Sequence, residues 1–568
     1  MTTSEMQAPR TYPALEPDNG GTRSRLRSRW AAPGAFTGLG LVLFVAYLAE
    51  ASKLPIFADG SSQALQAWDM LRGNLLLHGW VLSDVSFYTT ELPQYMLIEL
   101  VRGLSPYVVH IAAAMTYALL VVLTAVLAKG KATGREALVR VLIPVGIMLA
   151  PPFGRVLFSR GYSTAWILLS APDHTGTQVP LVLTWLVLDR MRPRWWLPVV
   201  VTALLTWVEI ADSTAIFEGA LPIVVVCAVR MYRRRGGLAA QWHDLGLGVG
   251  ALASAGAAMV AVAVIQSHGG FAVNPAPTAL ATIEGMTASF WVKVHSILIL
   301  FGADFFGLSA ANAAIPIAHL VAVALVAWGV TRAVRQFFAD DDLARQVVTA
   351  SFLLLLAEFM FGYRTGAREA VGLLPIGAAL AGRTLALRVS QLRLVPALAA
   401  MMACYCLSMG YYILAPPLPS PDQPLASWLR AHHLSYGLSA SWYSSNGVTL
   451  YSQDRVQVRD VRITAGGELT RLRWNTKASW YSARLHDARF VVLNPCATKF
   501  PDRLIHTIGP PARTYFAAGF TVLVWDTNLL ARHASPAPLL ARASAGVPSL
   551  PRPPPAFLQS AAYEVMCG

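Results

Sequence analysis

Acidic residues recur in the polar segments that separate the long apolar stretches of this chain. Asp59 stands a few residues after the first apolar stretch, and Asp173 lies beside His174 in "SAPDHTGTQ". A positioned carboxylate can take a proton from a hydroxyl group, so Asp59 is a candidate general base, with an exposed acid at a helix start as the alternative. Asp173 with His174 could supply an acid partner or ligands of a divalent cation, although one Asp–His pair is weak evidence for a metal. Other acids in these segments are Asp84, Glu91 and Asp212.

Two arginines four residues apart give a second chemical signal. The segment "YRTGARE" contains Arg364 and Arg368, which would share one face of a helix. Guanidinium groups bind phosphate oxygens through paired hydrogen bonds. The pair is therefore a candidate phosphate site, and pairing with Glu369 or with lipid headgroups is the alternative.

The composition indicates that these residues are carried by a membrane protein. Of the 568 residues, 55% are hydrophobic and 13% are charged, and the mean hydropathy is +0.49. A soluble chain of this length would need more charge to cover its surface. The net charge of +14 fits basic loops on the cytoplasmic side of a membrane, so we expect no nucleic-acid partner.

Apolar windows predict a polytopic α-helical membrane protein with about eleven transmembrane helices. The predicted spans are 34–52, 108–128, 138–152, 178–190, 195–210, 217–231, 244–265, 312–331, 346–362, 370–387 and 394–415. A cytoplasmic N-terminus places every strongly basic loop on the cytoplasmic side, as the positive-inside rule requires. A further membrane piece could lie within 290–302. The acidic segments and the arginine pair then fall on the outer side.

The chain divides into four regions by composition. We expect a disordered cytoplasmic N-terminus (1–30), a transmembrane domain (31–415) with a first outer loop at 53–107, an extracytoplasmic soluble domain (416–527) and a Pro/Ala-rich tail (528–568). The soluble domain is predicted to be a small α/β domain, with a helix in "DQPLASWLRAHHL" and strands in "GVTLYS", "RVQVRDVRIT", "RFVVLN" and "FTVLVWD". Its aromatic residues, which could stack on sugars or form the core, include Trp428, Trp442, Tyr443, Trp474, Trp480 and Tyr481.

The segment after the first span is amphipathic and too polar to cross a membrane. Between residues 61 and 75, apolar side chains recur on one helix face, so we expect a helix in the interface plane. The layout of a span, an acid, an in-plane helix and a loop with Pro93 before the next span occurs in "DGSSQALQAWDMLRGN" and "GWVLSDVSFYTTELPQY". This layout resembles the GT-C glycosyltransferase superfamily, which includes the protein O-mannosyltransferases. The segment "LASWLRAHHLSYGLSASWYSSNGVTLYS" also looks like the outer domains of some actinobacterial members.

The resemblance implies a membrane glycosyltransferase. It would transfer a sugar from a polyprenyl-phosphate donor to an acceptor on the outer face of the cytoplasmic membrane. Asp59 matches the first-loop acid of the family and would be the base, Asp173 a second catalytic residue, and Arg364 with Arg368 the donor-phosphate ligands. Further site candidates are His174, Asp84, Glu91 and Asp212.

A non-catalytic transporter, or a carrier of lipid-linked sugars, is the alternative. Transporters usually carry repeated halves or charges at mid-span, and neither is visible in this sequence. Membrane lipid is an expected partner in either case. No cofactor is identified, and only a divalent cation stays open.

Cysteines outside the spans suggest a covalent link. Cys496 and Cys567 fall in the expected extracytoplasmic regions, where oxidising conditions permit a disulfide. Two free thiols are the alternative.

Overall fold

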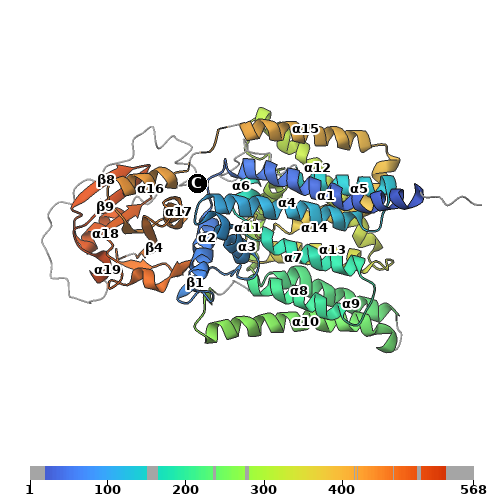
Figure 1. Cartoon of the computed structure of the whole chain (residues 1–568), viewed down its shortest axis with the longest axis horizontal. Helices are drawn as coiled ribbons and strands as arrows, with labels where there is room; N and C mark the ends of the chain where they lie inside the picture. The colour runs from blue at the N-terminus through green and yellow to red at the C-terminus, as the bar shows by residue number, and fades with distance from the viewer. Residues whose placement is uncertain are drawn as a thin grey trace, which may run out of the picture.

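A helical bundle carries a sheet-containing unit at one end (Figure 1). The computed structural model describes residues 20–149, 164–234, 238–274, 280–414, 416–418, 420–464, 466–494 and 500–532. Cys496, Cys567 and the tail beyond residue 532 therefore lie outside the described residues, and the proposed disulfide stays a prediction.

Helices of 14 to 32 residues form the bundle. They are α1 (Gly20–Ala51), α4 (Tyr107–Lys129), α5 (Gly134–Leu149), α7 (Thr175–Arg190), α8 (Leu197–Ala211), α9 (Leu221–Arg234), α10 (Leu238–Ser267), α12 (Ala310–Gln336), α13 (Leu343–Phe361), α14 (Leu373–Gln391) and α15 (Val395–Leu414). Among the described residues, seven helices are long and apolar enough to cross a membrane. The polytopic helical class is thus confirmed. Helix α1 begins at Gly20, inside the segment expected to be disordered, because an Arg-rich run is compatible with helix.

Helix α11 (Ile283–Leu300) is one of these seven by length and composition. Ala281, just before it, donates its backbone N–H to the carbonyl of Phe361 at 2.9 Å. Ser296, near its other end, donates to the carbonyl of Thr365 at 2.6 Å. Both ends of α11 therefore contact the same end of α13 and the segment after it. We infer that α11 lies along this end of the bundle, in the segment where a further membrane piece was expected.

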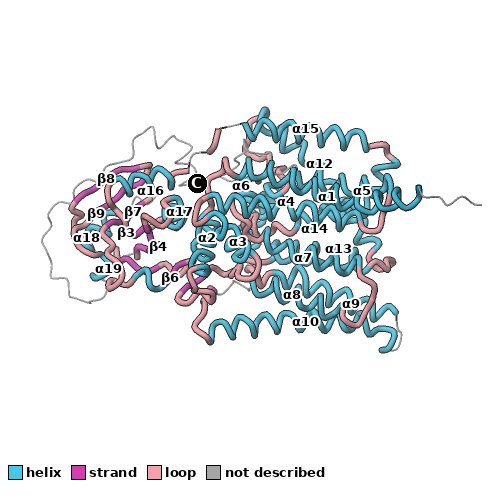
Figure 2. The backbone as a smooth tube through the Cα atoms, viewed as in Figure 1, coloured by secondary structure: helices cyan, strands magenta, loops and turns pink. Residues whose placement is uncertain are grey.

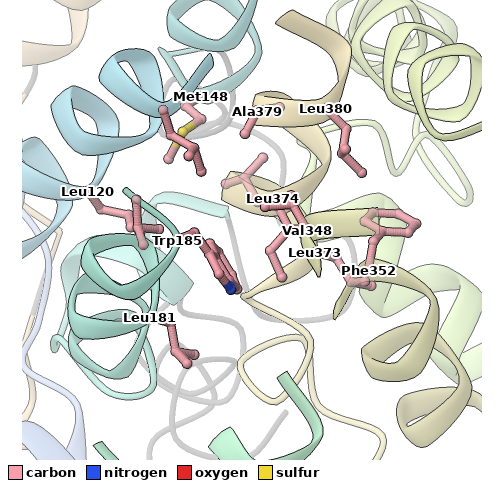
Figure 3. Packing of buried hydrophobic residues seen from close by; sticks show 14 of the residues in the cluster. Leu120, Met148, Leu181, Trp185, Val348, Phe352, Leu373, Leu374, Ala379 and Leu380 are labelled. Carbon is pink, nitrogen blue, oxygen red and sulfur yellow. The ribbon is translucent and has the colours of Figure 1, made fainter. Parts of the chain in front are cut away.

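Small residues let the central helices approach closely. A Cβ atom on Gly382 of α14 would lie 2.7 Å from the carbonyl oxygen of Arg140 on α5. Such close approach compensates for the weak hydrophobic drive between helices in lipid. Larger side chains such as Trp185 and Phe352 fill the remaining space at the centre of the bundle (Figure 3).

The sheet domain comprises the elements from α16 (Asp422–Ala431) to α19 (Leu529–Arg532). Its sheet has the strand order β5-β4-β3-β7-β9-β8. The strands are β3 (Tyr436–Ser439), β4 (Gln457–Ile463), β5 (Leu469–Arg471), β7 (Phe490–Leu493), β8 (Arg513–Ala517) and β9 (Phe520–Val524). Strand β3 is parallel to both β4 and β7, and the other pairs are antiparallel.

Three of the four predicted strands and the predicted helix of this domain are present. The prediction for "GVTLYS" was wrong, because this segment belongs to helix α17 (Trp442–Tyr451). Helix α17 packs between β4 and the helix of the first loop, α2 (Ala58–Leu71). Its apolar residues are therefore buried by tertiary packing that a short sequence pattern does not reveal.

A second, small sheet joins the bundle to the sheet domain. Strand β1 (Trp80–Leu82) of the first loop pairs with β2 (Ala272–Val273), which follows α10, and with β6 (Thr476–Lys477) of the sheet domain. Figure 2 shows the strands confined to the sheet domain and to this boundary beside α2. The residues around β6 are thereby held against the first loop.

Candidate active site

Helix α2 begins three residues before the predicted start, so Asp59 lies in its first turn. A Cβ atom on Gly60 would lie 2.7 Å from Val109 and 2.9 Å from Ala171. The start of α2 is therefore pressed against α4 and against the segment that carries Asp173. Unlike an interfacial helix with a wet face, α2 also buries its polar face, because the sheet domain covers it. Asn446 of that domain, for example, donates to Ser62 Oγ at 2.9 Å.

A cavity of about 440 Å³ opens beside Asp59. The charged residues that line it are Asp59, Asp84, Asp173, His174, Arg368 and Glu369. Its aromatic walls include Phe57, Phe87 and Trp166 from the bundle and Trp442 and Trp474 from the sheet domain. Five of the residues proposed from sequence thus share one cavity, between the bundle and the sheet domain.

Asp173 and Arg368 form a buried ion pair at this cavity. Arg368 donates to Asp173 Oδ2 at 2.8 Å and to Ser170 Oγ at 2.7 Å. Gln63 donates to the other oxygen of Asp173 at 2.6 Å. The guanidinium also lies over the ring of Phe57, with 3.7 Å between its carbon and the ring centre. Arg368 is therefore held rigidly, and both oxygens of Asp173 are engaged.

Arg364 reaches the cavity through Asp84. Its guanidinium donates to Asp84 Oδ2 at 2.7 Å. Arg364 itself does not line the cavity, but Asp84 does. A guanidinium has five N–H donors, and Asp84 accepts from one of them, so within the described part of the chain the others can serve another acceptor.

His174 and Asp212 form a second charged pair. His174 Nδ1 lies 2.9 Å from Asp212 Oδ2, and Asp212 also accepts from the Thr214 backbone N–H at 2.9 Å. Burial acts against the charge on His174, but the carboxylate of Asp212 outweighs it and raises the pKa of His174 to about 9. Burial likewise opposes ionisation of Asp212, yet His174 and Thr214 lower its pKa to about 2. The pair is therefore an imidazolium with a carboxylate.

The pKa of Asp59, unlike that of Asp212, is raised. Burial, and next the carboxylate of Asp173, raise the pKa of Asp59 well above its usual range, whereas Arg368 and His174 act in the lowering direction. A base whose pKa approaches neutrality is suited to take and release a proton.

Glu91, a further site candidate from the sequence, does not line the cavity. It is fully buried at the start of α3 (Glu91–Arg102), and a Cβ atom on Gly176 of α7 would lie 2.5 Å from its carboxylate. Burial raises its pKa to about 8. Glu91 thus packs behind the site.

Sequence reasoning named Glu369 only as a partner for arginine, whereas it lines the cavity. It also missed Asn475, a buried neutral amide that contacts Asp59. Within the described part of the chain, no three His, Cys, Asp or Glu residues lie close enough together to hold a metal ion.

No protein-family model matches the sequence, and no curated protein matches it. Solved structures do match. ArnT from Cupriavidus metallidurans, bound to undecaprenyl phosphate, superposes with a TM-score of 0.51 at 11% identity, over 87% of this chain and 98% of that chain. The Archaeoglobus fulgidus oligosaccharyltransferase, tethered to an acceptor peptide, gives a TM-score of 0.44 at 10% identity, over 83% of this chain and 71% of that chain. The ArnT match shows a shared fold, so the predicted GT-C-like fold is confirmed.

Proposed function

We propose that this chain, which has the fold of the GT-C membrane glycosyltransferases, transfers a sugar from a polyprenyl-phosphate donor to an acceptor hydroxyl group. The observation that carries the proposal is one cavity that combines Asp59, a carboxylate with a raised pKa, with the cations Arg368 and His174. The ArnT structure of the same fold contains undecaprenyl phosphate, which supports a lipid phosphate as the donor class. The outer face of the cytoplasmic membrane is the proposed side.

Asp59 acts as the general base in this proposal. It accepts the proton of the acceptor hydroxyl as the acceptor oxygen attacks the anomeric carbon of the sugar. The bond between that carbon and the phosphate oxygen breaks, and the polyprenyl phosphate leaves with the bonding electrons.

The cations stabilise the departing phosphate. The Nδ1 atom of His174 contacts Asp212. The Nε2–H group can therefore donate a hydrogen bond to a phosphate oxygen. Arg368 and Arg364 are already neutralised by Asp173 and Asp84. The phosphate must therefore share these guanidiniums with the carboxylates, and Arg364 has more free donors for this.

Purified protein in lipid nanodiscs, given polyprenyl-phosphate sugars and candidate acceptors, tests the proposal. Asp59→Asn keeps the size of the side chain but removes the base, so we expect transfer to fall about 10²–10⁴-fold. Asp69→Asn is the matched control, because Asp69 lies on the same helix, pairs with Lys477 at 2.9 Å and does not line the cavity. Full activity of Asp59→Asn would exclude the base role. Donor binding without transfer by the unmodified protein would favour a carrier.

A further inference from the structure

Asn475 connects the sheet domain to the proposed base. It is 4% exposed and follows Trp474, which lines the cavity. Its Nδ2 donates to Asp59 Oδ1 at 3.1 Å, although the two residues are 416 positions apart in the chain. The contact therefore exists only when the sheet domain is seated on the bundle.

Two donors fix the orientation of the Asn475 amide. The backbone N–H of Ser83 donates to Asn475 Oδ1 at 3.1 Å, and Gln66 Nε2 donates to the same oxygen at 3.2 Å. A backbone N–H can only donate, so the atom that faces Ser83 must be the amide oxygen. The NH₂ group is then obliged to face Asp59. With Oδ1 of Asp59 engaged in this way, Oδ2 is the oxygen available to an acceptor hydroxyl.

The backbone of Asn475 is held just as firmly. It has a φ of 51°, in the left-handed region that Asn tolerates better than most residues. The next residue, Thr476, pairs with Val81 in the small sheet. Asn446 donates to the Asn475 carbonyl at 3.4 Å. The loop is therefore positioned from both sides, which keeps the side chain directed toward Asp59.

We infer that Asn475 is a positioning residue that holds the Asp59 carboxylate for proton transfer, so that the sheet domain completes the site. The catalytic meaning of this inference rests on the proposed function, but the contact can be tested by itself. The charged groups that face Asp59 from the other elements packed against it are Asp84, Asp173, His174 and Arg368. Since burial and Asp173 both oppose the charge on Asp59, a fixed N–H donor matters more here than it would in water.

Infrared titration of the full chain in lipid nanodiscs reads the protonation of Asp59 without any substrate. The carboxyl band that disappears in Asp59→Asn belongs to Asp59. Asn475→Asp keeps the shape but replaces the donor with a carboxylate, and Asn475→Gly removes the side chain while keeping a left-handed backbone. In both variants we expect the midpoint of the band to move to higher pH, by about one unit or more.

Arg72→Ala is the matched control. Arg72, at the end of α2, also links that helix to the sheet domain, through Asp454 at 3.3 Å, but it is not among the hydrogen-bond partners of Asp59 or Asn475. The midpoint of the Asp59 band should stay in place in this variant. An unmoved midpoint in both Asn475 variants, or an equal shift in Arg72→Ala, would overturn the inference.

A transfer assay separates this inference from the proposed function. If the positioning role and the proposed function both hold, the acidic limb of the pH–rate profile of Asn475→Asp moves to higher pH together with the infrared midpoint. If the unmodified protein transfers no sugar while the infrared midpoint still shifts, the proposed function fails and the positioning contact stands.

Discussion

At the scale of single residues, His174 and Asp212 set each other's charge, and this predicts the alkaline side of the pH profile. Transfer needs Asp59 ionised and His174 protonated, so the rate should rise as Asp59 loses its proton and fall as pH passes about 9, the pKa of His174. Asp212→Asn removes the carboxylate that keeps His174 charged. The alkaline limb should then move to lower pH, and the acidic limb should move to higher pH, because a neutral His174 no longer lowers the pKa of Asp59.

Asp304→Asn provides the matched control for this measurement. Asp304 also accepts a hydrogen bond from a histidine, His295, at 3.0 Å, but neither residue lines the cavity. Its pH–rate profile should keep both limbs. If the alkaline limb keeps its midpoint in Asp212→Asn, His174 does not act as a cation in transfer.

Charged site residues could be predicted from sequence, whereas their neutral partners could not. Asp59, Asp173, His174 and Arg368 stand out because ionisable groups are rare beside apolar spans. Asn475 carries no charge, and its contact with Asp59 depends on a tertiary arrangement that a linear pattern does not contain. The pairing of the two arginines with Asp84 and Asp173 likewise could not be predicted from a linear pattern.

At the scale of elements, Gly60 predicts how closely α2 must approach α4. Its missing Cβ would meet Val109 at 2.7 Å and Ala171 at 2.9 Å. Gly60→Ala should therefore destabilise the fold by about 1–3 kcal/mol through overpacking. Because Asp59 is the preceding residue, the displaced helix start should also reduce transfer.

Gly38→Ala in α1 is the control for Gly60→Ala. A Cβ atom there would meet nothing within 4 Å, so Ala should leave stability unchanged or raise it by up to about 1 kcal/mol. Thermal unfolding of both variants in the same detergent gives the comparison. Equal midpoints would show that α2 can move without cost.

Hydropathy predicted the bundle helices better than it predicted the elements around the site. Spans such as α4 are long and uniformly apolar, so length alone identifies them. Helix α11 is also long and apolar enough to cross a membrane, yet its two ends contact the end of α13 and the segment just after it. The second half of helix α17 was predicted as a strand because α2, which is remote in sequence, contributes to its burial.

At the scale of the whole molecule, the sheet domain and the bundle work as one unit. The small sheet that joins β1, β2 and β6 fixes the domain over the cavity, and Trp442 and Trp474 form part of its wall. The bundle supplies the acids and cations, and the sheet domain supplies the cover and Asn475. Neither part forms the cavity alone.

The orientation of this unit in the membrane can be tested by labelling its two ends. The basic segment around Lys131 follows α4, which runs away from α2, so it lies at the end of the bundle remote from the sheet domain (Figure 1). The positive-inside rule assigns that end to the cytoplasm. In a variant with its five native cysteines replaced, Arg484→Cys, at an exposed position of the sheet domain, should react with a membrane-impermeant maleimide in intact cells. Lys131→Cys, which is also exposed, should react only after the cells are opened. The reverse pattern would place Asp59 and the cavity on the cytoplasmic side, and a donor in the outer leaflet could then not reach the site.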